Sequence, residues 1–200
     1  MPNPNLFFST PIWISEINNY KDVNEELYNY IKNLQNEDEK GLTKSNIKGW
    51  HSKNFDLNNN KVVNFINLIS PNINQVMKDM NWDTKNQDVK ISGMWAIINT
   101  GGASNARHHH GNSDISAAYY VRAPKKCGEI VFYDPRPAPV FSHPISAESN
   151  LLNAMVNSIN PVEGGLILFP SYLDHSVNQN LSNEERIVIS FNLSLLKKTI

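Results

Sequence analysis

From about residue 89 onward the chain consists of short apolar runs divided by turn signals, and this pattern limits the fold more than any other feature. The runs expected to form strands cover residues 90–98, 114–122, 128–133, 164–169 and 186–195. Glycine and proline mark the breaks between them, as in Thr100-Gly101-Gly102 and Asp134-Pro135-Arg136-Pro137. Short strands with such turns are typical of a β-sandwich or a β-barrel.

The first 88 residues follow a different pattern. Residues 7–17 are expected to form a strand, with Pro11 favouring an edge position or a break. Apolar residues recur at helical spacing over 22–35 and again over 60–80, where Pro71 is expected to kink or divide the helix. Helices followed by a run of strands predict a mainly β (α+β) protein in which N-terminal helices pack on a β core.

Length and composition add a few limits. The 200 residues suit a single domain, with a strand and supporting helices in 1–88 and the β core in 89–200. A net charge of -1 and a pI near 6.6 offer no electrostatic basis for binding nucleic acid or anionic membrane. A single cysteine, Cys127, excludes an internal disulfide framework. We see no signal peptide or transmembrane segment and expect a cytoplasmic protein.

Two histidines one residue apart, with a third far downstream, predict a metal site. On an extended backbone His108 and His110 point to the same face, whereas His109 points away. Imidazole is the commonest side-chain ligand for a transition metal such as iron. A third ligand, His175, contributed by a distant strand would complete one face of the metal and leave positions open for a cosubstrate and oxygen.

The last strand carries a polar face that suits a carboxylate ligand. In the run from residue 186, Arg186, Ser190 and Asn192 share one face with Val188, and the alternate residues are apolar. The planar fork of an arginine binds a carboxylate through two hydrogen bonds. A metal and a buried arginine together are what a dicarboxylic keto acid needs, because one end can chelate the metal while the far carboxylate meets the guanidinium.

Ordered motifs over nearly the whole chain resemble one known family, the 2-oxoglutarate-Fe(II) oxygenases found in bacteria and marine phages. In chain order the motif blocks are Leu6-Phe7-x-Ser9-Thr10-Pro11-Ile12-Trp13, Asn105-x-x-His108-x-His110-x-Asn112-Ser113, Ile115-Ser116-x-x-Tyr119-Tyr120-Val121, Gly128-x-Ile130-x-Phe132-x-Asp134-Pro135-Arg136, Gly164-x-Leu166-x-Leu168-Phe169-Pro170-Ser171, His175-x-Val177 and Glu185-Arg186-x-x-x-Ser190-Phe191-Asn192. No single block is decisive, but the ordered set is specific.

The resemblance implies a double-stranded β-helix, or jelly roll (cupin-like), with Fe(II) at one end. It also implies that His108, His110 and His175 bind the iron and that Arg186 binds the C5 carboxylate of 2-oxoglutarate. The activity that it implies is a dioxygenase, a hydroxylase that uses O2 and couples 2-oxoglutarate decarboxylation to oxidation of a small-molecule or peptidyl substrate. A phage origin, with the host cytoplasm as location, is consistent with this resemblance.

The chain departs from the wider superfamily in its metal ligands. Most such oxygenases use a His-x-Asp/Glu…His triad, whereas a histidine stands here at the carboxylate position. Asp114 would supply the carboxylate if the loop folds back. We name Ser190, Asn192 and Tyr119 as further candidates for contacts to 2-oxoglutarate. Because Tyr119 and Tyr120 alternate faces, which of the two reaches the pocket stays open.

Two other functions remain as alternatives. A three-histidine cupin-type metalloenzyme that does not use 2-oxoglutarate would suit neutral ligands but gives Arg186 no purpose. A non-catalytic jelly-roll structural or binding protein would bind no stoichiometric iron. The segments 36–60 and 136–160 are expected to form the substrate loops, although His51 and His143 there are expected to be structural. The substrate is not readable from the sequence, and a homodimer is an open expectation.

Overall fold

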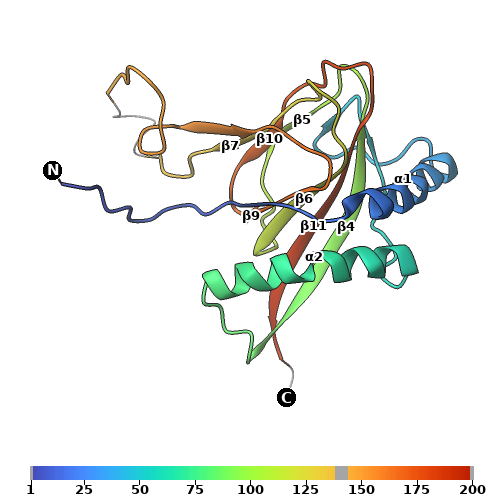
Figure 1. The fold of residues 1–200 in the computed structure, drawn as a ribbon, viewed down its shortest axis with the longest axis horizontal. Helices are drawn as coiled ribbons and strands as arrows, with labels where there is room; N and C mark the ends of the chain where they lie inside the picture. Colours follow the sequence, from blue (N-terminus) through green and yellow to red (C-terminus); the bar gives the residue numbers. More distant parts are fainter. Residues whose placement is uncertain (1, 138–143, 199–200) are drawn as a thin grey trace.

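Eleven strands and two helices make up the part of the chain that the computed structural model describes, which is residues 2–137 and 144–198 (Figure 1). The elements are, in chain order, β1 (Trp13–Glu16), α1 (Tyr20–Glu37), β2 (Asn46–Ile47), β3 (Trp50–His51), α2 (Asn60–Asp79), β4 (Gln87–Asn99), β5 (Ser104–His108), β6 (Ile115–Arg122), β7 (Ile130–Tyr133), β8 (Val156–Ile159), β9 (Gly165–Pro170), β10 (His175–Val177) and β11 (Arg186–Lys197).

The strands form two antiparallel sheets. The larger has the order β1-β9-β6-β11-β4-β3 and the smaller has the order β2-β5-β10-β7-β8. Leaving out the three N-terminal strands, the eight strands from β4 to β11 alternate between the sheets except at β7 and β8, which pair with each other in the smaller sheet. The first of the eight pairs with the last, and the second with the seventh. This arrangement is a double-stranded β-helix, so the predicted fold class is confirmed.

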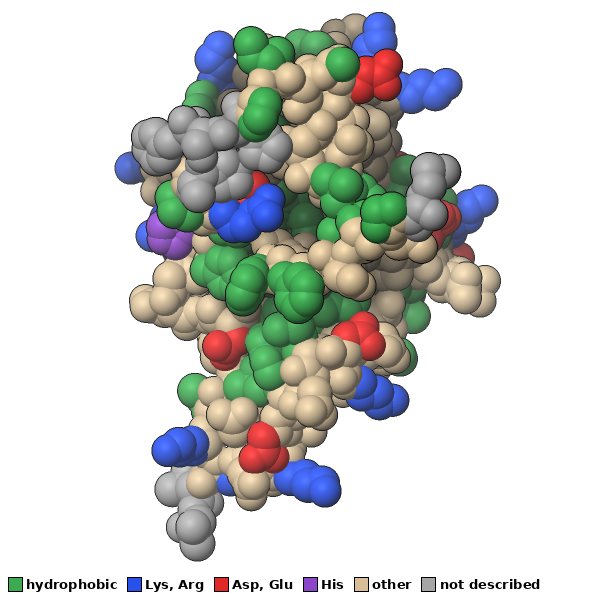
Figure 2. Space-filling model, turned by 90° about the vertical axis from the view of Figure 1, so that its left-hand side faces the viewer, with side chains coloured by type: hydrophobic (Ala, Val, Ile, Leu, Met, Phe, Trp, Pro, Cys, Tyr) green, Lys and Arg blue, Asp and Glu red, His purple; other side chains and the backbone are tan. Residues whose placement is uncertain are grey.

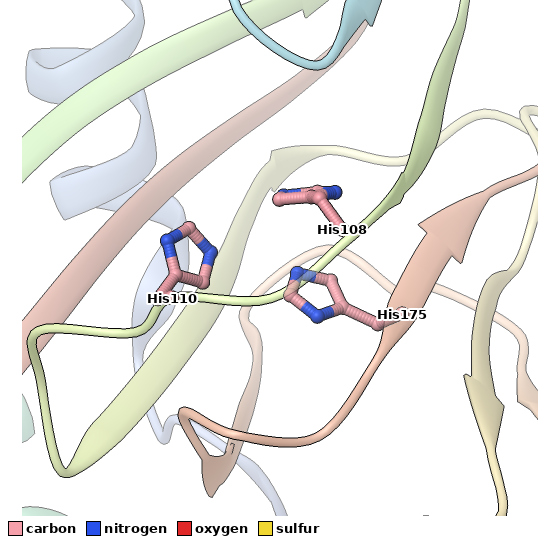
Figure 3. Close-up of side chains that lie close together, drawn as sticks. All are labelled: His108, His110 and His175. Atoms are coloured by element: carbon pink, nitrogen blue, oxygen red, sulfur yellow. The ribbon is translucent and has the colours of Figure 1, made fainter.

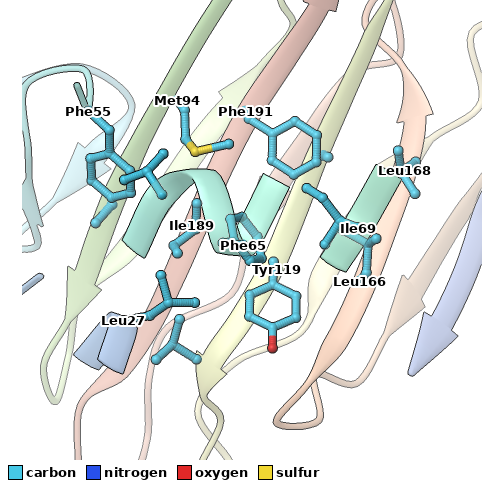
Figure 4. Packing of buried hydrophobic residues seen from close by; sticks show 14 of the residues in the cluster. Leu27, Phe55, Phe65, Ile69, Met94, Tyr119, Leu166, Leu168, Ile189 and Phe191 are labelled. Atoms are coloured by element: carbon cyan, nitrogen blue, oxygen red, sulfur yellow. The ribbon is translucent and has the colours of Figure 1, made fainter. Parts of the chain in front are cut away.

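Both helices cover one face of the larger sheet. Figure 1 shows α1 and α2 on one side of the long strands, and Figure 4 shows the side chains that fill the space between them. Phe65 of α2 is fully buried there and its ring centroid lies 4.8 Å from that of Tyr119 on β6. Among the described residues, no helix combines the length and the apolar character needed to cross a membrane. The helices therefore serve to bury the outer face of the sheet, as the sequence predicted.

The opposite face of the larger sheet meets the smaller sheet. A second, smaller apolar cluster lies between them and is made of Ala118, Tyr120, Ile130, Phe132, Ile167, Phe169, Leu173 and Val188. Along β11 the alternation is strict, because Ile187, Ile189 and Phe191 pack in the helix-side core while Val188 belongs to the inter-sheet cluster. Successive residues of β11 therefore pack alternately in the core beside the helices and in the core between the two sheets.

Some strand predictions were wrong in extent. The strand expected over 7–17 is limited to β1, because residues 2–12 run as an arm without a partner strand and Phe8 is 91% exposed. Helix α2 runs through Pro71 without a break. The short strands β5, β8 and β10 were not predicted as separate elements, since they have few apolar residues and are defined by their pairing. The division of the chain after residue 88 stays a prediction, although β1, β2 and β3 join the two sheets.

One side of the molecule carries many exposed apolar side chains. Figure 2 shows hydrophobic side chains gathered on the face toward which the N-terminal arm extends. The exposed apolar residues of the arm and of the segment before β8 are Leu6, Phe7, Phe8, Ile145, Leu151, Leu152 and Met155. Contiguous apolar surface of this kind is typical of contact surfaces.

Candidate metal centre and active-site cavity

Three histidines converge at one end of the β-helix (Figure 3). His108 is the last residue of β5 and lies directly opposite His175, the first residue of β10, in the antiparallel pairing of these strands. His110 follows in the loop after β5, where its backbone N–H donates to the Ser171 carbonyl at 2.9 Å. One ring nitrogen from each histidine lies within 4.8 Å of the other two. These residues could therefore hold one metal ion.

Hydrogen bonds fix the orientation of two of the rings. The Nδ1 atom of His108 lies 2.8 Å from the Ala106 carbonyl, and the Nδ1 atom of His175 lies 3.0 Å from the Leu173 carbonyl. A carbonyl oxygen only accepts, so Nδ1 must carry the proton in both rings. The lone pair is then left on Nε2, the tautomer that a metal ligand needs.

Burial keeps the three imidazoles neutral. Desolvation and, to a smaller degree, the neighbouring His108 lower the pKa of His175 to about 3 and that of His110 to about 4. Desolvation also lowers the pKa of His108. Since a metal binds the neutral imidazole, the cluster is ready to accept an ion at neutral pH.

The acidic residues near the cluster face away from it. Asp174 accepts from Arg107 at 2.7 Å and pairs with His109 at 3.0 Å on the outer side of the strands. The alternative in which Asp114 supplies a carboxylate ligand is wrong, because its Oδ2 accepts the backbone N–H of Leu195 and the described cluster contains histidines alone. The outward position of His109 agrees with the predicted alternation.

A cavity of about 820 Å³ opens between the two sheets and contains the histidines in its wall. The predicted polar face of β11 lines it with Arg186, Val188, Ser190 and Asn192. Arg186 is 1% exposed, and its Nη1 donates to the carbonyls of Cys127 and Gly128 at 2.7 and 2.9 Å. No described residue forms an ion pair with it, and the carboxylate of Asp174 pairs instead with Arg107. A buried cation without an anion is costly, so this position calls for an anionic ligand.

Tyr119 and Tyr120 lie on opposite faces of the larger sheet. The prediction that Tyr119 contacts 2-oxoglutarate is wrong. Tyr119 points into the helix-side core, where its hydroxyl donates to Asn24 Oδ1 at 2.7 Å. Tyr120 lines the cavity, where burial raises its pKa and keeps the hydroxyl protonated. The residues of β6 alternate as expected, but the alternation does not tell which face belongs to the cavity. Tyr120 therefore replaces Tyr119 as the candidate for a contact to a ligand.

Asn192 stands beside the third histidine. Its side-chain amide lies 3.4 Å from Nδ1 of His110 and also contacts the Ser116 hydroxyl at 2.9 Å. Ser116 in turn contacts the Ser171 hydroxyl at 2.8 Å. Asn192 thus belongs to a chain of polar side chains that supports His110. The hydroxyl of Ser190 lines the cavity and forms no hydrogen bond with another described residue.

Several residues of the cavity wall were not named individually from the sequence, among them His51, Trp95, Lys44 and Lys53. His51, expected to be structural, stacks on Trp95 with ring centroids 5.6 Å apart and an interplanar angle of 10°. Lys44 and Lys53 also line the cavity, so the segment 36–60 contributes to the wall as expected. The alternation of β4 could have identified Trp95, because Met94 and Ala96 on either side are buried among apolar residues. His51 has no comparable signal.

The other segment expected to form a substrate loop, 136–160, does not reach the cavity with its described residues. His143 lies outside the described residues.

A sequence model of the family described as "Putative 2OG-Fe(II) oxygenase" matches residues 93–192, which run from β4 to β11 and contain the whole histidine cluster and Arg186. The chain belongs to this 2OG-Fe(II) oxygenase family. The enzyme is therefore a 2-oxoglutarate-dependent Fe(II) oxygenase with Fe(II) and 2-oxoglutarate as its cofactors. Three neutral nitrogen donors and an unpaired buried guanidinium in one cavity fit these two cofactors.

Solved structures with the same fold include several 2-oxoglutarate enzymes. A prolyl-4-hydroxylase of Pseudomonas putida has a TM-score of 0.67 and 12% identity, over 96% of this chain and 95% of that one. The epimerase SnoN from nogalamycin biosynthesis has a TM-score of 0.66 and 10% identity, over 92% and 78%. A viral collagen prolyl hydroxylase from Paramecium Bursaria Chlorella virus-1 has 0.58 and 13%, over 91% and 94%. At these identities the likeness shows the fold alone. No curated protein matches the chain in sequence.

The lowered histidine pKa values predict a pH-dependent stability of the metal-free protein. In an unfolded chain both imidazoles titrate near pH 6.5, whereas the folded values are about 4 for His110 and about 3 for His175. Below about pH 6.5 the unfolded state binds protons that the folded state does not, so the free energy of unfolding falls until the folded pKa values are reached. Urea unfolding in the presence of a chelator, at about pH 7 and about pH 5, measures this loss.

The matched control is the double variant His110→Gln/His175→Gln, whose amides do not titrate. The wild type should lose more stability than the variant between the two pH values. Equal losses in the two proteins would contradict the assigned pKa shifts.

Proposed function

We propose that His108, His110 and His175 bind the Fe(II) and that Arg186 binds the distal carboxylate of 2-oxoglutarate, in an enzyme that hydroxylates its substrate. The observation that carries this proposal is that one cavity holds both the three convergent imidazoles and a buried guanidinium without an acidic partner. Either feature alone would also suit a different kind of binding site, but a dicarboxylic keto acid needs both. Family membership favours this function over the cupin-type and non-catalytic alternatives.

Iron and 2-oxoglutarate, when bound, supply the oxidising chemistry, in which decarboxylation of the keto acid to succinate is coupled to oxidation of the substrate by O2. The chain provides the positions and the environment. Carbonyls of Cys127 and Gly128 hold Nη1 of Arg186, which leaves its remaining N–H donors for a carboxylate. The protonated hydroxyl of Tyr120 lies on the same wall and can donate a further hydrogen bond.

We infer that Asn192 is a positioning residue for His110 and not a direct contact to 2-oxoglutarate. For Nε2 of His110 to bind iron, Nδ1 must carry the proton and needs an acceptor. In the structure the amide nitrogen of Asn192 faces Nδ1 of His110 at 3.4 Å and its oxygen accepts from Ser116 at 2.9 Å. Turning the amide by 180° about its last side-chain bond would present the oxygen to the protonated Nδ1 of His110 and let the nitrogen donate to Ser116. In that orientation the Ser116 hydroxyl donates a hydrogen bond to the Ser171 hydroxyl, so every polar group in this chain has a hydrogen-bond partner.

Several features of the enzyme's setting stay predictions. A homodimer is supported by the exposed apolar side chains of the N-terminal arm and of residues 144–155. A cytoplasmic location is supported by a single buried thiol, Cys127. The charge balance of the chain favours no nucleic acid as partner.

Conversion of 2-oxoglutarate to succinate, measured with Fe(II) and O2 in the absence of an added substrate, tests the proposal. His175→Ala should abolish this turnover because it removes a ligand. Arg186→Lys should raise the KM for 2-oxoglutarate by about tenfold or more, because a lysine keeps the charge but lacks the planar fork. Turnover that survives His175→Ala unchanged would rule out the ligand assignment.

The matched control is His109→Ala, since this histidine lies between two of the proposed ligands but pairs with Asp174 on the outer side. Its turnover should stay close to that of the wild type. If His109→Ala were as inactive as His175→Ala, the loss would reflect damage to the loop and not loss of a ligand.

A pair of substitutions at Asn192 tests its positioning role. Asn192→Asp keeps an acceptor for His110, whereas Asn192→Leu removes it, so Fe(II) should bind about tenfold or more weakly to the leucine variant only. Calorimetric titration with Fe(II) in the absence of oxygen measures both affinities, and the KM for 2-oxoglutarate is measured beside them. A raised KM with unchanged metal affinity in Asn192→Leu would instead make Asn192 a contact to the keto acid.

A further inference from the structure

The wall of the active-site cavity carries charge of one sign. Among the described residues that line it, Lys44, Lys53, Arg107 and Arg186 are cationic, and none is an aspartate or a glutamate. The chain as a whole has a net charge of -1, so this excess is a local property of the cavity. A cleft lined by one sign of charge concentrates ligands of the opposite sign.

The four cations are not equivalent. Arg186 is buried at the position proposed for 2-oxoglutarate, and Arg107 is neutralised by Asp174 at 2.7 Å and lies 4.0 Å from the centre of the Tyr133 ring. Lys44 forms no ion pair with any described residue. Lys53 is 3.4 Å from an oxygen of Asp38, but its side chain is 76% exposed, so this pair is weak.

The positive charges of Lys44 and Lys53 are therefore available to bind an anionic ligand. Both are exposed and both line the cavity, which places them where it opens to solvent. Because 2-oxoglutarate would be held by the buried Arg186, these two lysines are left for the second substrate.

A row of rings leads from the histidine cluster toward this opening. Trp95 lies with its ring centroid 5.9 Å from that of His110, and His51 stacks on it at 5.6 Å. Burial lowers the pKa of His51, whose Nδ1 donates to the Ser52 carbonyl, and the nearby charge of Lys44 lowers it further. The row is thus uncharged, offers flat apolar surface, and reaches the vicinity of Lys44 at its outer end.

The indole of Trp95 also has an unused donor. Its Nε1 is buried and has no hydrogen-bond partner among the described residues. A buried N–H without a partner costs free energy, and such a group in a cavity wall is typical of a binding site.

We propose that the oxidised substrate is a small organic anion, with a carboxylate or phosphate held by Lys44 and Lys53 and a flat or apolar body that lies against Trp95. This inference rests on the proposed function, since it places the carbon to be oxidised beside the histidine cluster. The cavity of about 820 Å³ has room for a small molecule next to 2-oxoglutarate. Lysine acts as a point charge, so either anionic group suits it. A cationic substrate would be repelled from the opening.

Three probes that share one ring and differ in charge test the proposal: indole-3-acetate, indole-3-acetamide and tryptamine. Each is titrated calorimetrically, without oxygen, into the protein loaded with Fe(II) and saturating 2-oxoglutarate, which keeps the anionic probe away from Arg186. Indole-3-acetate should bind about tenfold or more tightly than indole-3-acetamide, and tryptamine should bind most weakly. Equal affinities, or no binding of indole-3-acetate, would overturn the proposal.

The role of the lysines is tested with the double variant Lys44→Gln/Lys53→Gln. The preference for indole-3-acetate over indole-3-acetamide should disappear in this variant. The matched control is Lys48→Gln, because Lys48 is exposed in the same segment and does not line the cavity; this variant should keep the wild-type preference. A preference that persists in the double variant would overturn the role of the two lysines.

The same titrations separate this inference from the proposed function. If the wild type fails to bind Fe(II) and 2-oxoglutarate, the proposed function itself fails. If it binds both but does not distinguish the three probes, only the substrate inference is overturned. A panel of carboxylate and phosphate derivatives of the same ring then identifies which anionic group the site prefers.

Discussion

The antiparallel pairing of β5 with β10 is the constraint on which the rest of the site depends. It sets His108 directly opposite His175, so two imidazoles that are far apart in the sequence lie side by side on paired strands. Because side chains alternate along a strand, a slip of one residue in either strand would turn its histidine to the outer face and separate the two rings. The backbone hydrogen bond from His110 to Ser171, which directly follows β9, then fixes the loop that carries the third ring.

The two faces of the larger sheet explain how such a site is stable. One face is covered by α1 and α2 and supplies most of the apolar burial, with Phe65 at its centre. The other face can therefore hold polar groups, including a guanidinium that is almost fully buried at Arg186. Placing a cation there is unfavourable in itself, and the carbonyls of Cys127 and Gly128 offset only part of that cost. An anionic ligand bound by Arg186 would offset the rest of this cost, so we expect binding of 2-oxoglutarate to raise the stability of the folded protein.

Much of this site could be predicted from the sequence, and the errors have physical reasons. The alternation along β11 correctly placed Arg186 and Asn192 on one inward face, because that strand is long and its other face is strongly apolar. The same rule separated Tyr119 from Tyr120 but could not say which face holds the cavity. His51 lies on a strand of two residues that exists only through its pairing with β4, so no local pattern reveals it.

The most direct test of the account is an anaerobic titration of the metal-free protein, first with Fe(II) and then with 2-oxoglutarate, in the wild type and in Arg186→Ala. Chelation of the iron by the keto acid produces a visible metal-to-ligand charge-transfer band. We expect this band in the wild type, and in the variant a band that needs far more 2-oxoglutarate to appear. Iron binding without a band, or the same titration curve in both proteins, would contradict the claim that the histidines and Arg186 form one site.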